Sequence, residues 1–271
     1  INRFEQNILL KIQAHKSLIS QFGRCYRGIL TGFNKAFIID KVTYDELTQD
    51  NINKQIIKPI WEGKDLKKWT VIEQIEKWII FTRRGVEISE YPLIEKYLQK
   101  YKEPLTPKIN MDENTGRKVG NYKWYEIQDV VDYYRKFELP KIIFPNLQNV
   151  NKFAFDETGV YLNAPSVFLP SNDKALLAVL NSKVVWHFLK SICVIRSGGY
   201  IEVKPQYFEQ IPIPDIDPNM KTELFELTEK IIQAKTNNLQ AEIPSLESQI
   251  DQLVYQLYNL TEEEIKIVEG N

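Results

Sequence analysis

Cysteine and histidine are scarce in this sequence, and both scarcities limit what the protein can be. Among 271 residues, the only cysteines are Cys25 and Cys193, too few for a disulfide framework and typical of the reducing cytoplasm. With His15 and His187 they show no metal-site spacing. Apolar runs such as residues 175–180 are far too short to cross a bilayer, and the first residues do not resemble a signal peptide. We therefore expect a globular cytoplasmic protein with no metal and no membrane partner.

Catalytic motifs are missing as well. The sequence has no phosphate-binding Gly-x4-Gly-Lys-Ser/Thr loop, no glycine-bearing loop for S-adenosylmethionine, and no Asn-Pro-Pro-aromatic tetrapeptide of the kind that holds a flipped adenine. Glu202-Val-Lys204, with Asp156 or Asp173 upstream, matches part of a metal-dependent nuclease pattern. Matches this short arise often by chance, so alternating charges on an exposed strand edge are the favoured interpretation. We assign no catalytic and no metal-binding residue.

Charge is distributed unevenly along the chain. Residues 24–204 hold 28 Lys and Arg against 22 Asp and Glu, whereas residues 215–271 hold 4 against 12. Aromatic residues lie among the cations of the first segment, where they can stack on nucleotides or simply fill a core. The pattern points weakly to a nucleic-acid partner.

Apolar spacing divides the chain into three parts. Residues 1–22 are predicted to form a linker helix leading in from an upstream domain outside this chain. Residues 23–214 mix short strands and helices, which predicts an α+β body with a mixed β-sheet and flanking helices. In residues 215–271, heptad spacing predicts an α-helical hairpin or a short coiled coil. This tail could pack on its own domain or bind a partner.

Local patterns predict the elements of the body. We expect strands at 78–82 and 141–145, helices at 91–101 and 174–189, a polar loop at 108–122, and a hairpin joining 153–155 to 160–162.

Residues 24–40 are the most informative segment. We predict a β-hairpin whose turn carries Thr31, Gly32, Asn34 and Lys35, followed by an apolar strand at 36–39. Short polar and basic groups on a rigid hairpin suit contacts to phosphates or base edges, while an ordinary glycine turn is the plain alternative.

Donors beside aromatics and glycines recur in three further loops, around residues 83–85, 115–124 and 195–200. Arginine, asparagine and glutamine can read base edges, and hydroxyls can bind phosphates. Each cluster alone is more often a solvated loop, but together they favour a binding surface. The predicted DNA-binding residues are Arg27, Thr31, Asn34, Lys35, Arg83, Arg84, Arg117, Lys118, Asn121, Lys123, Trp124, Tyr125, Arg196, Ser197 and Tyr200.

A series of segments in this order resembles a known family, the TaqI-like C-terminal specificity domain. This is the target recognition domain of adenine-N6 DNA methyltransferases and of fused type IIG restriction–modification enzymes. The resemblance covers about residues 23–214, and its segments lie at 28–39, 60–66, 91–98, 124–127, 140–143, 177–182 and 211–214, the last reading Ile-Pro-Ile-Pro.

The resemblance implies a non-catalytic domain that grips duplex DNA from the major-groove side while an upstream methyltransferase domain flips the adenine. The family's hairpin motif corresponds to residues 31–35, and its aromatic-plus-glutamate motif to Trp124, Tyr125 and Glu126. The parent enzyme would use S-adenosylmethionine, and Mg²⁺ if it also cleaves DNA, with no cofactor in this chain. The methyltransferase domain would belong to the same polypeptide or to a separate subunit.

Three alternatives stay open. The tail looks similar to the spacer helices of type I specificity subunits, so the chain could be a fragment of such a subunit. A metal-dependent nuclease using Glu202 and Lys204, and a protein-interaction module built on the tail, are the others.

Overall fold

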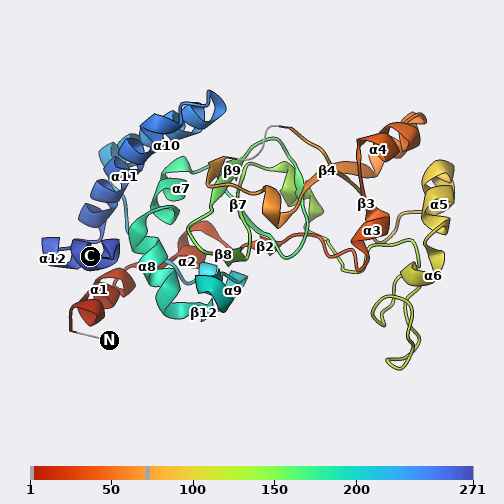
Figure 1. The fold of residues 1–271 in the computed structure, drawn as a ribbon, viewed down its shortest axis with the longest axis horizontal. Coiled ribbons are helices and arrows are strands. Elements are labelled where there is room, and N and C mark those ends of the chain that lie inside the picture. Colours follow the sequence, from red (N-terminus) through yellow and green to blue (C-terminus); the bar gives the residue numbers. More distant parts are fainter. Residues whose placement is uncertain (1–2, 71–73, 271) are drawn as a thin grey trace.

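Short strands assemble into small sheets in the computed structural model, which describes residues 3–70 and 74–270 (Figure 1). The strands are β1 (Lys16–Ser17), β2 (Tyr26–Arg27), β3 (Ile38–Ile39), β4 (Ile57–Trp61), β5 (Trp69–Thr70), β6 (Trp78–Ile80), β7 (Lys141–Phe144), β8 (Leu147–Gln148), β9 (Ala154–Asp156), β10 (Tyr161–Leu162), β11 (Val167–Pro170), β12 (Val194–Ile195), β13 (Ile201–Glu202) and β14 (Pro212–Ile213). The helices are α1 (Arg3–Gln13), α2 (Leu18–Phe22), α3 (Asn34–Phe37), α4 (Lys41–Leu47), α5 (Pro92–Gln99), α6 (Lys102–Leu105), α7 (Lys174–Leu180), α8 (Lys183–Ile192), α9 (Pro205–Phe208), α10 (Pro218–Thr236), α11 (Ile243–Leu257) and α12 (Glu262–Glu269). The predicted α+β class is confirmed.

A five-stranded sheet in the order β2-β11-β7-β9-β5 separates two hydrophobic cores. Successive side chains of a strand point to opposite faces, so Ile142 and Phe144 of β7 enter one core and Ile143 enters the other. β11 repeats this alternation. A strand buried on both faces is apolar at successive positions, and the apolar residues 142–144 make this strand recognisable in the sequence.

Helices cover one face of this sheet, and a second sheet closes the other. The first core takes apolar side chains from α1, α7, α8, α10, α11 and α12. The second lies between the five-stranded sheet and a four-stranded sheet in the order β10-β4-β6-β3, with α3, α4, α5 and α6 at its far side. Figure 1 shows the resulting arrangement. The helices of the first core form a helical bundle at one end. Helices α3, α4, α5 and α6, with the loop that follows α6, form a lobe at the other end, called the α3–α6 lobe, and the central strands lie between the two.

The acidic tail forms a helical hairpin that packs on its own body. α10 lies against both α7 and α11. Leu224 and Ile231 of α10, with Ile250 and Val254 of α11, are buried in the first core. The heptad-spaced residues of the described tail therefore face the chain itself.

The predicted hairpin at residues 24–40 is wrong. β2 pairs with β11, β3 pairs with β6 in the other sheet, and residues 34–37 form the helical turn α3. The hydroxyl of Thr31 accepts the Phe33 N–H (3.1 Å) and donates to the Asn34 side chain (2.6 Å). These local bonds lead the chain into a helical turn and compete with a tight hairpin turn.

The hairpin predicted around Gly159 is also wrong. β9 lies between β7 and β5, whereas β10 runs parallel to β4 in the other sheet. The turn between them is stabilised by the carboxylate of Asp156, which accepts the Thr158 N–H (2.9 Å). It connects two sheets and does not pair neighbouring strands.

The helix predicted at 174–189 is broken in two. Ser182 accepts the Val185 N–H (3.3 Å) as the N-cap of α8, and α8 bends 60° away from α7. No single helix in the described ranges is long and apolar enough to cross a membrane; only the bent pair α7–α8 would pass by length and composition.

Candidate nucleic-acid interface

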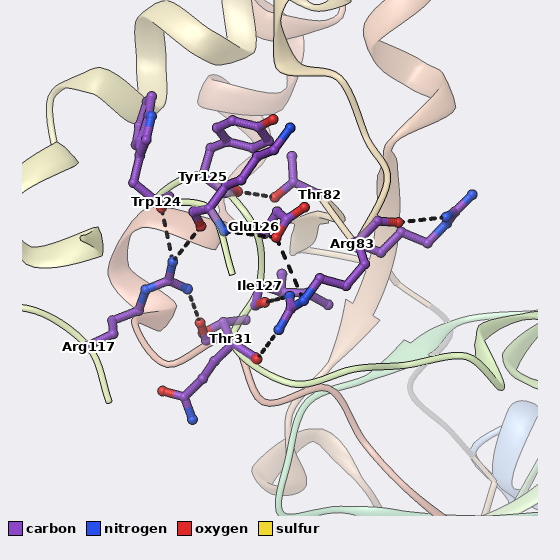
Figure 2. Close-up of polar contacts among 11 residues, drawn as sticks. Thr31, Thr82, Arg83, Arg117, Trp124, Tyr125, Glu126 and Ile127 are labelled. Carbon is purple, nitrogen blue, oxygen red and sulfur yellow. Dashed lines mark hydrogen bonds and ion pairs between the residues drawn. The ribbon is translucent and has the colours of Figure 1, made fainter. Parts of the chain in front are cut away.

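Arg117 binds three segments of the α3–α6 lobe together from inside. It is only 4% exposed, and its guanidinium donates to the carbonyl oxygens of Leu105 (2.7 Å), Thr31 (2.8 Å) and Trp124 (2.9 Å). Burial lowers the pKa of Arg117 to about 10. Figure 2 shows Arg117 pointing inward between Thr31 and Trp124. The loop of residues 106–117 is therefore closed at its base by an arginine that it supplies itself.

Arg84 holds the following segment in the same way. Its guanidinium donates to the carbonyl oxygens of Ile127 and Gln128, the latter at 2.6 Å, and its Nε lies 3.7 Å from the Glu126 carboxylate. The hydroxyl of Thr82 donates to the Tyr125 carbonyl (2.5 Å). Residues 125–128 are thus fixed by contacts to residues 82 and 84, more than 40 positions away in the chain.

The structure brings many of the predicted DNA-binding residues of this lobe together, but it divides them by exposure. Thr31, Arg117 and Tyr125 are buried, and Arg84 and Trp124 are half-buried. Trp124 meets Tyr125 edge-on, with 5.6 Å between ring centroids, so the two rings pack on each other. The exposed candidates around this cluster are Asn34, Lys35, Lys118, Asn121 and Lys123.

Arg83 points away from this cluster. Its guanidinium carbon lies 4.7 Å from the ring centroid of Tyr134, and its Nη1 donates to the Arg84 carbonyl (3.0 Å). Arg83 and Tyr134 line a cavity of about 330 Å³. Neither Arg117 nor the residues that it bonds line this cavity. Arg83 as a whole is half-buried.

Arg196, Ser197 and Tyr200 lie elsewhere, in the β12–β13 hairpin, and all three are exposed. Gly198 and Gly199 form its turn with φ of 73° and 76°, a left-handed conformation that favours glycine. In the view of Figure 1, this hairpin lies toward the helical bundle, far from α5 and α6. The predicted residues therefore do not form one continuous surface, because this hairpin and Arg83 both lie apart from the cluster around Arg117.

The three carboxylates of the nuclease alternative each serve a local structural role. Glu202 is paired with Arg196 and, at 3.5 Å, with Lys204, and the hydrogen bonds from Arg196 lower its pKa. Asp156 is buried beside Lys141, and Asp173 caps α7 by accepting the Leu176 N–H. Among the described residues, no group of three or more histidines, cysteines or carboxylates could hold a metal ion.

A further hollow was not predicted from the sequence. It has a volume of about 660 Å³ and lies between the β2 segment and the segment that leads into α9, with Arg24, Arg27 and Lys204 in its lining. Of the predicted residues only Arg27 lies there, and Glu202, the ion-pair partner of Arg196, lines it too. The spacing Arg24-x-x-Arg27 was a usable signal, but nothing local indicates that Lys204 lies opposite.

Comparison with known proteins identifies the family. The model of the TaqI-like C-terminal specificity domain matches residues 58–213. The type II methyltransferase M.PaeR7I of Pseudomonas aeruginosa is 26% identical over 255 residues, covering 90% of this chain and 39% of that protein. M.BanIII of Aneurinibacillus aneurinilyticus is 23% identical, covering 83% of this chain and 40% of that protein.

The fold is also similar to a solved structure, the type IIL restriction–modification enzyme MmeI in complex with DNA. The TM-score is 0.64 at 13% identity, covering 94% of this chain and 36% of that chain. The chain spans about two fifths of the length of the curated relatives. The resemblance seen in the sequence is confirmed: the family model matches more than half of the chain, and the protein belongs to the TaqI-like C-terminal specificity domain family.

Proposed function

We propose that this chain is the duplex DNA recognition part of an adenine-specific DNA methyltransferase, with or without a fused endonuclease. Membership of a specificity-domain family supports this, and so does the construction of the α3–α6 lobe. Its exposed amides and cations stand on loops that Arg84 and Arg117 hold from inside. Donors on loops fixed by a rigid scaffold can meet DNA in one geometry, as sequence-specific contacts require.

The candidate residues then divide by role. Asn34, Lys35, Lys118, Asn121 and Lys123 are exposed and would contact DNA directly, as would the β12–β13 hairpin through Arg196, Ser197 and Tyr200. Arg84, Arg117 and Thr31 would position these loops, because their polar groups are engaged inside the protein.

The rest of the parent enzyme would supply the chemistry. The relatives are methyltransferases of which this chain covers about two fifths, which supports a catalytic domain in the same polypeptide. That domain would bind S-adenosylmethionine, since this chain has no glycine-bearing loop for it; Mg²⁺ would be needed only for a fused nuclease. Residues 23–214 would contact DNA, and residues 1–22 and 215–271 would connect to the catalytic part, all in the cytoplasm.

The decisive experiment is single-molecule sequencing of host DNA with and without the parent gene, scored for N6-methyladenine. We expect one short motif to lose its methylation, and the purified chain to prefer duplexes with that motif over scrambled ones. Unchanged methylation together with no binding preference would refute the proposal. Co-purification with a separate methyltransferase chain would instead favour a type I-like specificity subunit.

A further inference from the structure

The hollow beside β2 is built from segments distant in sequence, and hydrogen bonds hold these segments in place. The Cys25 N–H donates to the Glu209 carboxylate (2.9 Å), and the Tyr133 hydroxyl donates to the Arg27 carbonyl (2.9 Å). The Val203 N–H donates to the Asn146 carbonyl (2.7 Å). These hydrogen bonds, one of them made by the Glu209 side chain, hold the walls of the hollow together.

The charge of the lining suits an anion. Of its two carboxylates, Glu209 is engaged with Cys25, and Glu202 is paired with Arg196 and Lys204. Arg27 is exposed, and within residues 3–70 and 74–270 its guanidinium has no hydrogen bond or ion pair. Arg24 stands nearby, with its guanidinium carbon 5.9 Å from the Tyr26 ring centroid. The lining thus carries three cations, Arg24, Arg27 and Lys204, against two carboxylates, Glu202 and Glu209.

Lys136 adds to this cationic surface. Its Nζ lies 5.3 Å from the centroid of the same Tyr26 ring, so two cations flank one aromatic residue of the lining. A phosphate oxygen approaching β2 would meet positive charge from Arg24, Arg27 and Lys136.

Two side-chain amides complete the lining, and both are available. Within the described ranges the amide groups of Asn146 and Gln206 have no hydrogen-bond partner, and Gln206 is exposed. Nearby buried amides differ: Asn181 both donates to and accepts from the backbone of Phe153, and Gln148 bonds Pro145 and Lys152. An amide presents one donor and one acceptor side by side, the pattern that pairs with an adenine edge.

We infer that this hollow is a DNA-reading subsite that takes one base-pair edge and the adjoining phosphate of the duplex. Arg24 and Arg27 hold phosphate oxygens, and Asn146 and Gln206 bond the base edge. The inference rests on the proposed function and extends it to a specificity-determining pocket that adjoins the β12–β13 hairpin through Glu202.

The test uses the purified chain, fluorescence anisotropy, a duplex with the parent's motif, and a panel of its single base-pair variants. Arg27→Ala should weaken binding to every duplex about tenfold and reduce the salt slope by about one. Asn146→Ala and Gln206→Ala should leave the salt slope unchanged and lose discrimination at one base pair by roughly 5- to 150-fold.

Matched controls come from the same chain. Asn149→Ala removes an exposed amide of the loop after β8, outside the hollow, and Lys190→Ala removes an exposed cation of α8. Both variants should bind duplexes as the unsubstituted chain does. Thermal unfolding checks that each variant is folded. If the unsubstituted chain discriminates among duplexes and both amide variants discriminate equally well, the pocket inference is overturned and the proposed function stands. If the unsubstituted chain prefers no duplex, the proposed function itself fails.

Discussion

The guanidinium of Arg117 donates a 2.8 Å hydrogen bond to the carbonyl oxygen of Thr31, 86 positions earlier in the chain. Both residues were predicted from the sequence to face DNA. The structure shows them bonded to each other inside the α3–α6 lobe, where Arg117 also bonds the carbonyls of Leu105 and Trp124. Two residues predicted to contact nucleic acid therefore bond to each other inside the protein and stabilise the exposed loops around them.

Removing Arg117 should therefore destabilise the protein. Arg117→Ala leaves buried carbonyl groups without donors, which we expect to lower the free energy of unfolding by about 2–4 kcal/mol. Urea unfolding measures this loss. Lys118→Ala, at the exposed neighbouring position, should stay within about 0.5 kcal/mol of the parent chain. Equal stability of both variants would contradict the internal role of Arg117.

Lys118 should instead affect DNA binding. Because its ammonium is exposed on the 106–122 loop, Lys118→Ala should weaken binding to all duplexes alike and reduce the salt slope by about one. Binding titrations between low and high salt measure the slope. Glu113→Ala, in the same loop, removes the opposite charge and should not weaken binding. An unchanged slope in Lys118→Ala would exclude this loop from the interface.

Lys141 and Asp156 form a fully buried ion pair, so removing one partner should be costly. Lys141→Met leaves an uncompensated carboxylate, and we expect a loss of about 3–5 kcal/mol in urea unfolding. The double variant Lys141→Met/Asp156→Asn should recover part of that loss, since no charge stays buried. The exposed pair Lys41–Asp45 is the control: Lys41→Met should cost about 1 kcal/mol or less.

Stability should depend on pH through Glu264, which accepts a hydrogen bond from Lys11 at 2.6 Å and links α12 to α1. Burial raises the pKa of Glu264, but the hydrogen bonds from Lys11 and Thr261 outweigh it and lower the pKa below the ordinary 4.5. A depressed carboxyl pKa stabilises the fold above the unfolded value, and this stabilisation is lost as pH falls through the folded value.

Glu264→Gln should thus flatten the decline of unfolding free energy below about pH 4.5. Urea unfolding across this pH range measures the decline. Glu263→Gln, at an exposed position on the same helix, should retain the parent profile. Identical profiles for both variants would refute the Lys11–Glu264 contribution.

The chain by itself should not cleave DNA in Mg²⁺, because Glu202 is paired with cations and the described residues offer no metal-ligand group. Incubation of supercoiled plasmid with the purified chain and Mg²⁺ tests this. Cleavage that disappears in Glu202→Ala would revive the nuclease alternative.

Elements whose apolar pattern is complete within a few consecutive residues were predicted correctly. α5 begins at Pro92 and buries Ile94 and Leu98 at helical spacing, and β7 is apolar from residue 142 to residue 144. The loop at 108–122 is polar and irregular, as its composition indicates. The family resemblance was also readable, because it depends on the order of many short segments and on no pairing between them.

Pairing was decided by the tertiary structure alone. Residues 24–40 and 153–162 each contain two strands and a glycine turn, but β2, β3, β9 and β10 find partners far along the chain. The available cross-sheet partners bury both faces of the central sheet, which a local hairpin would not do.

The tertiary structure also decides whether a cationic side chain faces solvent or the interior. Arg27 and Arg117 are the same residue type, yet Arg27 lines a hollow without a hydrogen bond from its guanidinium in the described part of the chain, whereas Arg117 bonds three carbonyl groups inside the lobe. The sequence by itself determines how many side-chain hydrogen-bond donors this chain carries. Which of these donors can reach a ligand depends on the fold. Buried carbonyl groups need hydrogen-bond donors, and a side chain that supplies one, as Arg117 does, is no longer available to a ligand.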